Sequence, residues 1–260
     1  MKLSNRLDVF SEYVFSMLGK KVKEQEKKTG KKVLDLSIGT PNFPPSKEYV
    51  QKLQEFYTEP KASLYPGFGA IPEFSEALIS WYKKRFNVLI SDNELLPLLG
   101  AKEAIAHLLP ALINEEDEIL IPDPGYPAYI GSALMAKAIP VFYSLDNNFK
   151  LSIDEIDKKI TNKTKCIWVN FPSNPTGQVA TTDELQKLID FLKGKNIWLI
   201  YDNAYSEIAF DGFVAPSILE IDGAKEFTVE LNSFSKMFSF AGYRIGWAAG
   251  NKDAISGLAK

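Results

Sequence analysis

The sequence is poor in the residues from which several kinds of functional site are built. Its 260 residues include one cysteine, Cys166, and one histidine, His107. A single cysteine cannot form an internal disulfide, and this pair provides no cluster with the spacing of a metal site. Cys166 lies in the apolar run Cys-Ile-Trp-Val, and His107 lies in an apolar helical pattern with no serine or cysteine motif to serve. We therefore interpret both residues as structural and expect a reducing compartment and no metal centre.

Arginine is also scarce, and positive charge is spread unevenly. The three arginines are Arg6, Arg85 and Arg244, and the net charge is −3. A net negative charge argues against a general nucleic-acid-binding surface, which needs a basic face. Residues 1–32 nevertheless hold nine Lys and Arg against four Asp and Glu. We interpret this basic start as a solvated helical arm rather than a tail for nucleic acid or membranes.

Long apolar runs and a nucleotide-binding loop are absent as well. Asp8 and Glu12 interrupt the start of the chain, where a secretory signal needs a continuous apolar stretch. No uncharged apolar run is long enough to span a bilayer. A G-x-x-x-x-G-K-[ST] loop does not occur either. The sequence therefore predicts a cytoplasmic protein that does not enter the membrane and is not a P-loop nucleotide hydrolase.

What the sequence does contain is an alternation of short, β-rich apolar runs with helical patterns. Roughly the first 30 residues predict an amphipathic helix ending near Gly30, with an apolar stripe of Val9, Phe10, Val14, Met17 and Leu18. Strands are predicted over 33–39 and near 118–121, 139–143, 165–169, 197–201, 227–231 and 244–249. Helices are predicted at about 46–57, 71–86, 101–114, 126–137, 152–160 and 181–193, two of them with capping-box spacing. This alternation indicates βαβ units, and hence an α/β fold with a mainly parallel sheet and helices on both faces.

In such sheets ligands bind at the carboxyl ends of the strands, and polar residues follow several of the predicted strands. Asp202 follows one apolar run, and a buried carboxylate there needs a cation or hydrogen-bond donors. Asn174 follows another run in a proline-rich turn, and Tyr126 follows a third, where its ring could lie on an aromatic cofactor. Gly100-Ala101-Lys102 begins a helix, whose free N–H groups favour a phosphate.

The stretch from Ser233 to Gly246 contains the most specific chemistry. An unprotonated lysine amine, such as that of Lys236, can form a Schiff base with the aldehyde of pyridoxal 5′-phosphate (PLP). Arg244, eight residues later, offers a planar fork of donors that grips a phosphate in two places, and Ser233 adds a hydroxyl. Glycines on both sides of Arg244 let the backbone pass close to a ligand. These residues predict a PLP site.

In this order and spacing, the residues resemble those of the fold-type I PLP enzymes, and within them the class I/II aminotransferase family. The resemblance covers nearly the whole chain and rests on one set of positions: Gly100, Ala101, Lys102, Tyr126, Asn174, Asp202, Tyr205, Ser233, Lys236 and Arg244. It implies a three-layer α/β sandwich as the large domain. It also implies that the protein moves an amino group between an L-amino acid and a 2-oxo acid.

The resemblance assigns a role to each residue around the cofactor ring. Lys236 would bind PLP covalently and move the proton at the substrate α-carbon. Asp202 would face the pyridine nitrogen, which it keeps protonated. Tyr205 and Asn174 would hydrogen-bond the ring oxygen, and Tyr126 would stack on the ring.

The remaining implied roles concern the phosphate, the substrate and a second subunit. Ser233, Arg244 and the amides of residues 100–102 would hold the phosphate. Tyr65 matches a family tyrosine that reaches the phosphate of the neighbouring subunit, which implies a homodimer. Gly39 and Asn174 would bind the substrate.

Two departures from the family pattern stand out. Ala101 replaces a frequent serine or threonine and removes one hydroxyl from the phosphate site, although the surrounding Gly-Ala-Lys-Glu-Ala is loosely similar to the LL-diaminopimelate aminotransferase subgroup. The family also continues beyond residue 260, into a small domain that supplies an arginine for the substrate carboxylate. We therefore expect residues 1–45 to be an arm with part of the small domain, and 46–260 to be the PLP-binding large domain. With the small domain incomplete, the 260-residue form would bind PLP better than it turns over an amino acid.

Two other functions use the same cofactor residues. A PLP-dependent β-lyase would differ from a transaminase in its products rather than in these positions. A non-enzymatic PLP-binding domain of a transcription regulator would need an N-terminal DNA-binding module, for which about thirty arm-like residues leave no room. Side-chain selectivity for one amino acid depends on pocket details that the sequence alone does not place.

Overall fold

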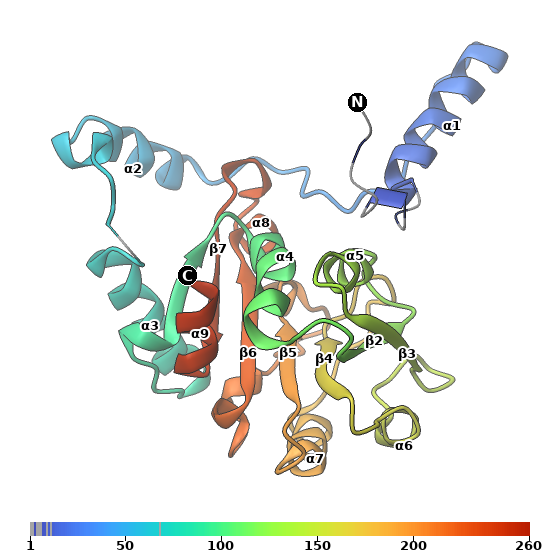
Figure 1. Ribbon diagram of the computed structural model, residues 1–260. Coiled ribbons are helices and arrows are strands. Elements are labelled where there is room, and N and C mark those ends of the chain that lie inside the picture. The colour runs from blue at the N-terminus through green and yellow to red at the C-terminus, as the bar shows by residue number, and fades with distance from the viewer. Residues whose placement is uncertain (1–2, 4–6, 9, 11, 68) are drawn as a thin grey trace. The chain divides into compact units, whose positions relative to one another are not determined.

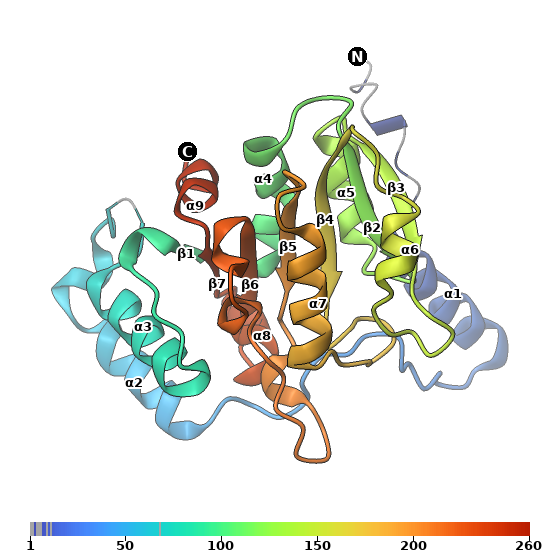
Figure 2. The ribbon, with the colours of Figure 1, turned by 90° about the horizontal axis from the view of Figure 1, so that it is seen from below.

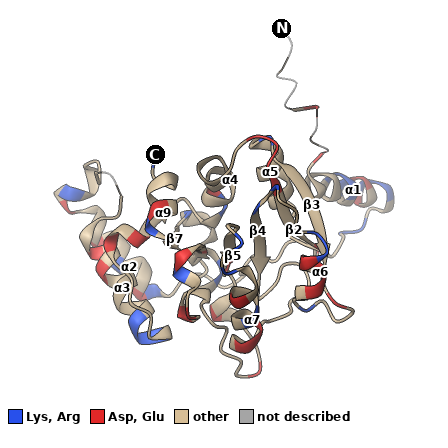
Figure 3. Cartoon of the chain, turned by 60° about the horizontal axis from the view of Figure 1, so that its bottom comes forward, with Lys and Arg blue, Asp and Glu red and all other residues tan. Residues whose placement is uncertain are grey.

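The computed structural model describes residues 3, 7–8, 10, 12–67 and 69–260, and the chain divides into two compact units, 1–42 and 43–260. In the first unit, the predicted helix is α1 (Val14–Thr29), which ends at Gly30 in the left-handed conformation (φ 65°). Val9 of the predicted apolar stripe lies outside the described residues. No residue of α1 is buried, and the colours of Figure 3 mark both basic and acidic residues along this helix.

The strand predicted over 33–39 is wrong, because these residues form no regular secondary structure. The apolar side chains of Leu34 and Leu36 are 83% and 84% exposed. A strand needs a hydrogen-bonded neighbour, and the sheet described below, which belongs to the second unit, contains no strand from this segment.

The second unit is built on one seven-stranded sheet (Figure 1), whose strands are β1 (Leu95–Leu98), β2 (Glu118–Asp123), β3 (Ile139–Ser144), β4 (Thr164–Asn170), β5 (Trp198–Asp202), β6 (Thr228–Ser233) and β7 (Gly246–Gly250). Their order across the sheet is β1-β7-β6-β5-β4-β2-β3. β7 runs antiparallel to both of its neighbours, and the other pairings from β6 to β3 are parallel. The predicted mainly parallel sheet is confirmed.

The helices also follow the predicted order. Those of the second unit are α2 (Lys47–Tyr57), α3 (Pro72–Phe86), α4 (Ala101–Leu112), α5 (Ala128–Met135), α6 (Ile153–Asp157), α7 (Thr182–Leu192), α8 (Phe234–Met237) and α9 (Lys252–Leu258). Short 3-10 helices are η2 (Pro60–Ser63), η3 (Asp92–Glu94), η4 (Ser206–Ile208), η5 (Ile218–Glu220), η6 (Ala224–Glu226) and η7 (Ala241–Tyr243). Thr181 caps α7 with a complete capping box, whereas at α6 only the Ser152 side chain caps. None of the described helices is both long and apolar enough to cross a membrane.

The sheet is buried on both faces, which confirms the three-layer sandwich (Figure 2). β4 shows the alternation: Ile167 and Val169 belong to the core with α3 and α7, while Cys166 and Trp168 belong to the core with α4, α5 and α9. Successive side chains of a strand point to opposite faces, so a nearly continuous apolar run is what a doubly covered strand requires.

The sequence reading missed β1, a four-residue strand that contains Pro97. A proline cannot donate to a ladder, so it argues against a central strand. The structure resolves the conflict because β1 is at the edge of the sheet and pairs with β7 on one side only. Its importance for the site is that the turn after β1 leads directly into α4.

Candidate active site

The predicted site residues follow strands that end at one edge of the sheet. Asn170, the last residue of β4, is in register with Asp202, the last residue of β5, and Asp202 is in register with Leu231 of β6. On the far side of β6, Ser233 is in register with Gly246, where β7 begins, and Gly246 with Leu98, where β1 ends. The sheet therefore gathers five chain segments at its carboxyl edge.

Asp202 is a buried carboxylate, 5% exposed, at the centre of this edge. Its Oδ2 accepts a hydrogen bond from the Tyr129 hydroxyl (2.7 Å), and its Oδ1 accepts from the Ala204 N–H (3.3 Å). Burial raises the pKa of Asp202, and these two hydrogen bonds partly oppose the rise. Within the described part of the chain, no ion pair involves Asp202. The site is thus suited to a ligand that brings a positive charge to this carboxylate.

Lys236, Tyr205 and Asn174 come together from three segments. The Lys236 amine lies 5.6 Å from the centre of the Tyr205 ring, and the Asn174 side-chain amide donates to the Tyr205 hydroxyl (3.3 Å). Burial lowers the pKa of the half-buried Lys236. Burial, with the charge of Asp202, raises the pKa of the Tyr205 hydroxyl. An amine that loses its proton more readily beside a protonated phenol is the combination that nucleophilic and proton-transfer chemistry requires.

Arg244 lies against the turn between β1 and α4. Its Nη2 donates to the Leu99 carbonyl (3.3 Å), and its backbone adopts φ 57° and ψ 56°, a conformation uncommon for a residue other than glycine. A Cβ atom on Gly100 would meet Nη2 at 2.7 Å, and one on Gly246 would lie 2.8 Å from the Ala101 nitrogen. The two glycines therefore let a guanidinium and the first amides of α4 approach each other, as an anion site needs.

The other predicted residues occupy different positions. Ser233 is buried and caps α8, its Oγ accepting from the Ser235 N–H (3.2 Å), so its own proton is available to a ligand. Tyr126 is half-buried and packs edge-on against Tyr129, with ring centres 5.6 Å apart. Lys102 is exposed in the first turn of α4.

The last two predicted residues lie outside the helices and strands. Tyr65 is fully exposed in the loop after η2. Gly39 belongs to the first unit, in the segment that forms no strand.

The sequence reading missed two residues that organise the site. Asn170 donates to the backbone carbonyl of Asp202 (2.7 Å), and its Oδ1 accepts from the Asn174 N–H (2.7 Å), so it fixes two strand ends together. It is the first polar residue after the run Cys-Ile-Trp-Val, which is the signal that could have identified it. Tyr129, the second tyrosine of Tyr-Pro-Ala-Tyr, gave no signal, because its partner is 73 residues away.

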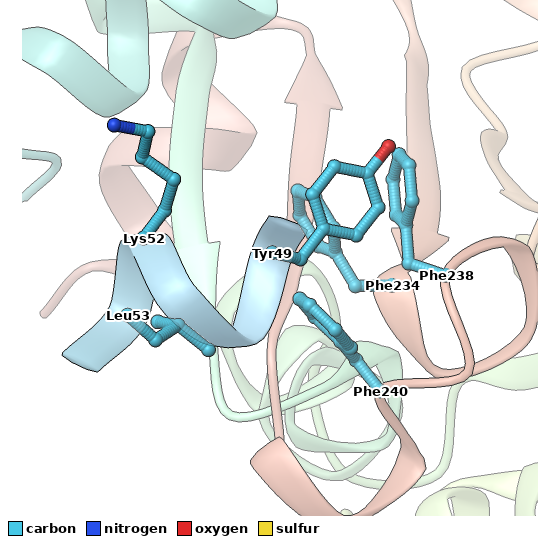
Figure 4. Close-up of a pocket in the computed structure, with 6 residues that line it drawn as sticks. All are labelled: Tyr49, Lys52, Leu53, Phe234, Phe238 and Phe240. Atoms are coloured by element: carbon cyan, nitrogen blue, oxygen red, sulfur yellow. The ribbon is translucent and has the colours of Figure 1, made fainter. Parts of the chain in front are cut away.

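An apolar pocket of about 320 Å³ lies next to this region (Figure 4), lined by Tyr49, Lys52, Leu53, Phe234, Phe238 and Phe240. The Tyr49 ring meets Phe238 and Phe240 edge-on, with centres 5.7 and 6.1 Å apart. Phe234 and Phe238 are one helical turn apart and stack on each other (5.2 Å), whereas Lys236 lies midway between them in sequence. In a helical turn, a residue two positions from another points to the opposite side. Phe234 and Phe238 therefore pack on the side of this turn that faces away from the Lys236 side chain.

The residues at this edge fit PLP. The guanidinium of Arg244, the Ser233 hydroxyl and the amides that begin α4 match a phosphate in charge and donor type. The buried Asp202 carboxylate matches a pyridine nitrogen that carries a proton, and the Lys236 amine matches an aldehyde. No group of three or more His, Cys, Asp or Glu side chains in the described residues could hold a metal ion.

Comparison with known proteins agrees with this arrangement. The family model "Aminotransferase class I and II" matches residues 31–260. The chain is 39% identical to an LL-diaminopimelate aminotransferase of Aquifex aeolicus, over all of this chain and 67% of that protein. An apo structure of BacF from Bacillus subtilis superposes with a TM-score of 0.92 and 34% identity, over 99% of this chain and 66% of that one. Aspartate aminotransferase from Rhizobium meliloti superposes with a TM-score of 0.92 and 25% identity, over 100% and 65%.

The chain thus spans about two thirds of the length of the relatives that it matches. Over that length, the match includes every segment that contributes to the carboxyl edge of the sheet. The chain therefore belongs to the class I and II aminotransferases, PLP-dependent enzymes that move an amino group between an amino acid and a 2-oxo acid, which confirms the family, fold and cofactor predicted from the sequence.

Proposed function

We propose that Lys236, Asp202 and Tyr205 are the catalytic residues of this aminotransferase and that Arg244, Ser233 and residues 100–102 bind the cofactor phosphate. The observation that carries the proposal is the meeting of the Lys236 amine, the Tyr205 ring and the Asn174 amide beside the buried Asp202 carboxylate. Bound PLP supplies an aldehyde that condenses with amines and a ring that takes up electrons.

Each protein group then has a defined task. Lys236 would hold the cofactor through its amine and would accept and return the proton of the substrate α-carbon. Asp202 holds a proton on the ring nitrogen, because a buried carboxylate strongly favours a neighbouring positive charge. Tyr205 and Asn174, already joined at 3.3 Å, bind the ring oxygen, and Asn174 also contributes to substrate binding. Tyr126 would lie against the face of the ring.

The test of Lys236 uses covalent attachment. PLP added to the 260-residue chain should give a Schiff-base absorbance band, and borohydride reduction followed by peptide mapping should locate the cofactor on Lys236. Lys236→Ala should abolish the band and lower turnover by about 100-fold or more. Lys187→Ala, at an exposed position on α7, is the matched control and should change neither. A reduced adduct at another lysine would contradict the assignment.

The test of the reaction class is product analysis. With an amino acid and a 2-oxo acid, a transaminase produces the exchanged pair and no free ammonia. An elimination would release ammonia without a 2-oxo acid and would favour a β-lyase. We propose LL-diaminopimelate as the first substrate to test, because relatives at 35–39% identity carry that name. Single-turnover conversion of the bound cofactor should be faster with LL-diaminopimelate than with aspartate or an aromatic amino acid.

We also propose that the working form is a homodimer in which Tyr65 reaches the phosphate site of the partner. Tyr65 is 100% exposed, and two large apolar neighbours in the second unit, Leu64 and Tyr57, are 70% and 69% exposed, which supports a covered surface here. Sedimentation equilibrium should give a dimer. Mixing Lys236→Ala with Tyr65→Phe chains should restore activity in hybrid dimers, because one of their two sites then has both residues intact. Absence of any recovery in verified hybrids would contradict the shared site.

A further inference from the structure

Tyr129 joins the two groups that would contact the cofactor ring from different directions. Its hydroxyl donates to Asp202 Oδ2 (2.7 Å), and its ring is nearly perpendicular to that of Tyr126 (ring centres 5.6 Å apart, planes at 85°). Tyr129 comes from α5, whereas Asp202 ends β5. Of the two hydrogen bonds that the described residues donate to the Asp202 side chain, the one from Tyr129 is the shorter, since the bond from the Ala204 N–H is 3.3 Å long.

The Tyr129 ring is held on both sides. It is fully buried and stacks on Trp168 of β4, with ring centres 4.5 Å apart and planes at 13°. Stacking of this kind with an edge-on partner on another side leaves the ring little freedom to turn. The position of the hydroxyl is therefore set by the sheet and not by the ligand.

The hydroxyl acts only as a donor to the carboxylate. Burial and the charge of Asp202 raise the pKa of Tyr129 well above its usual range, so the phenol keeps its proton. Among the described residues, the other titratable groups coupled to Asp202 are Tyr201 and Tyr205, whose pKa values its charge also raises. Without the Tyr129 hydroxyl, the Asp202 side chain would keep one long hydrogen bond in a buried setting.

We propose that Tyr129 is a positioning residue for the reaction, whose hydroxyl fixes both the orientation and the negative charge of the Asp202 carboxylate. The inference rests on the proposed role of Asp202 at the ring nitrogen, but the contact itself exists in the chain without cofactor. Tyr129 acts through Asp202 and does not touch the reacting atoms.

The experiment compares Tyr129→Phe with Tyr143→Phe. Both positions are fully buried tyrosines, and Tyr143 donates to a backbone carbonyl, that of Trp168 (2.8 Å), instead of a carboxylate. In cofactor-free protein labelled with ¹³C at the aspartate carboxyls, the Asp202 signal is assigned with Asp202→Asn and titrated. Tyr129→Phe should raise the pKa of Asp202, because it removes a hydrogen bond that favours the charged form, and Tyr143→Phe should leave it unchanged.

Kinetics give the second readout. Tyr129→Phe should lower kcat roughly tenfold or more while leaving PLP affinity within about twofold, because the phosphate contacts remain. In the Asp202→Asn background, Tyr129→Phe should have no further effect on kcat. An Asp202 pKa that is the same in Tyr129→Phe and wild type overturns the proposal, as does an equal shift in Tyr143→Phe.

The role of Tyr129 can still be tested if a variant does not fold or if the proposed function fails. If Tyr129→Phe does not fold, Trp168→Phe, which shrinks the stacked surface and leaves the hydroxyl, should raise the Asp202 pKa in the same direction, and an unchanged value would overturn the proposal. If the wild-type chain does not form a Schiff base with PLP at Lys236, the proposed function fails, but the titration of Asp202 without cofactor still decides the role of Tyr129.

Discussion

The guanidinium of Arg244 lies directly against Gly100, so that a Cβ atom at Gly100 would be 2.7 Å from Nη2 and 3.3 Å from Cζ. Nη1 donates to the Ala241 carbonyl (2.9 Å) and Nη2 to the Leu99 carbonyl (3.3 Å). The arginine thus bridges the turn before α4 and the loop before β7. Gly100 also has φ 82°, which residues with a side chain rarely adopt.

Gly100→Ala should therefore weaken PLP binding. The methyl group would displace the guanidinium, and loss of one charge-assisted contact to phosphate corresponds to a roughly tenfold or larger rise in Kd. Gly194→Ala is the matched control, because Gly194 has φ 76° and no atom within 4 Å of a Cβ built there. It introduces similar backbone strain without moving Arg244. Equal Kd values for the two variants would show that the contact does not matter for the cofactor.

Lys236 should react with aldehydes at lower pH than exposed lysines. Burial lowers its pKa, so at a given pH a larger fraction of Lys236 has lost its proton. The rate of reductive labelling by pyridoxal should rise with pH and level off below the value of about 10.4 typical of lysine. Mass spectrometry of the labelled peptides across pH 6–10 provides the measurement. Lys187 in the same sample is the internal reference, and identical profiles at both positions would contradict the prediction.

Tyr82→Phe should destabilise the second unit more than Tyr143→Phe. The buried Tyr82 hydroxyl donates to Glu230 Oε1 (2.8 Å) and accepts from the Asn232 amide (3.2 Å) and the Trp247 indole (3.1 Å). Its removal deprives three buried groups of a partner, with an expected loss of about 1–3 kcal/mol in the free energy of unfolding. Urea unfolding at pH 7 measures the difference. Equal losses in the two variants would indicate that the three-way contact adds nothing.

Because of Glu230, the free energy of unfolding should fall as the pH rises above the ordinary pKa of a glutamate. Burial raises its pKa in the folded protein, although Ser217, Tyr82, Asn232 and the Ile218 N–H oppose the rise. A raised folded pKa means that the folded state binds the proton more tightly, so the favourable contribution is complete below about pH 4.3 and is lost as the pH rises through the folded pKa. Asp202 and Glu220 have pKa values raised in the same direction.

The Glu230→Gln variant measures how much of this pH dependence of stability comes from Glu230. Its free energy of unfolding between pH 4 and 8 should have a shallower slope than that of wild type, as measured by urea unfolding at each pH. A slope equal to that of wild type would mean that Glu230 does not titrate differently in the folded and unfolded chains.

Much of the fold was predictable because its signals are local. The apolar runs that became β2 to β7 and the helical patterns between them are read from neighbouring residues, and Thr181 with Glu184 marked the start of α7. The two strand errors share one cause. Residues 33–39 have strand-like sequence but pair with no strand of the sheet, whereas β1 has an unfavourable proline but pairs with β7. Whether a segment forms a strand therefore depends on the strand available beside it as well as on its own residues.

By itself, the sequence determined the types and order of the elements and the identity of the reactive groups. A lysine eight residues before an arginine and an aspartate after a buried strand are chemical facts of the chain. Only the tertiary structure decided which groups meet. Tyr129 and Asp202 are 73 residues apart, and Arg244 and Leu99 are 145 apart. Their contacts depend on the parallel pairing of β4 with β5 and on the reversal of β7 between β6 and β1. Side-chain periodicity specifies which face of a strand is buried, but strand order arises from packing across the whole sheet, which no local pattern encodes.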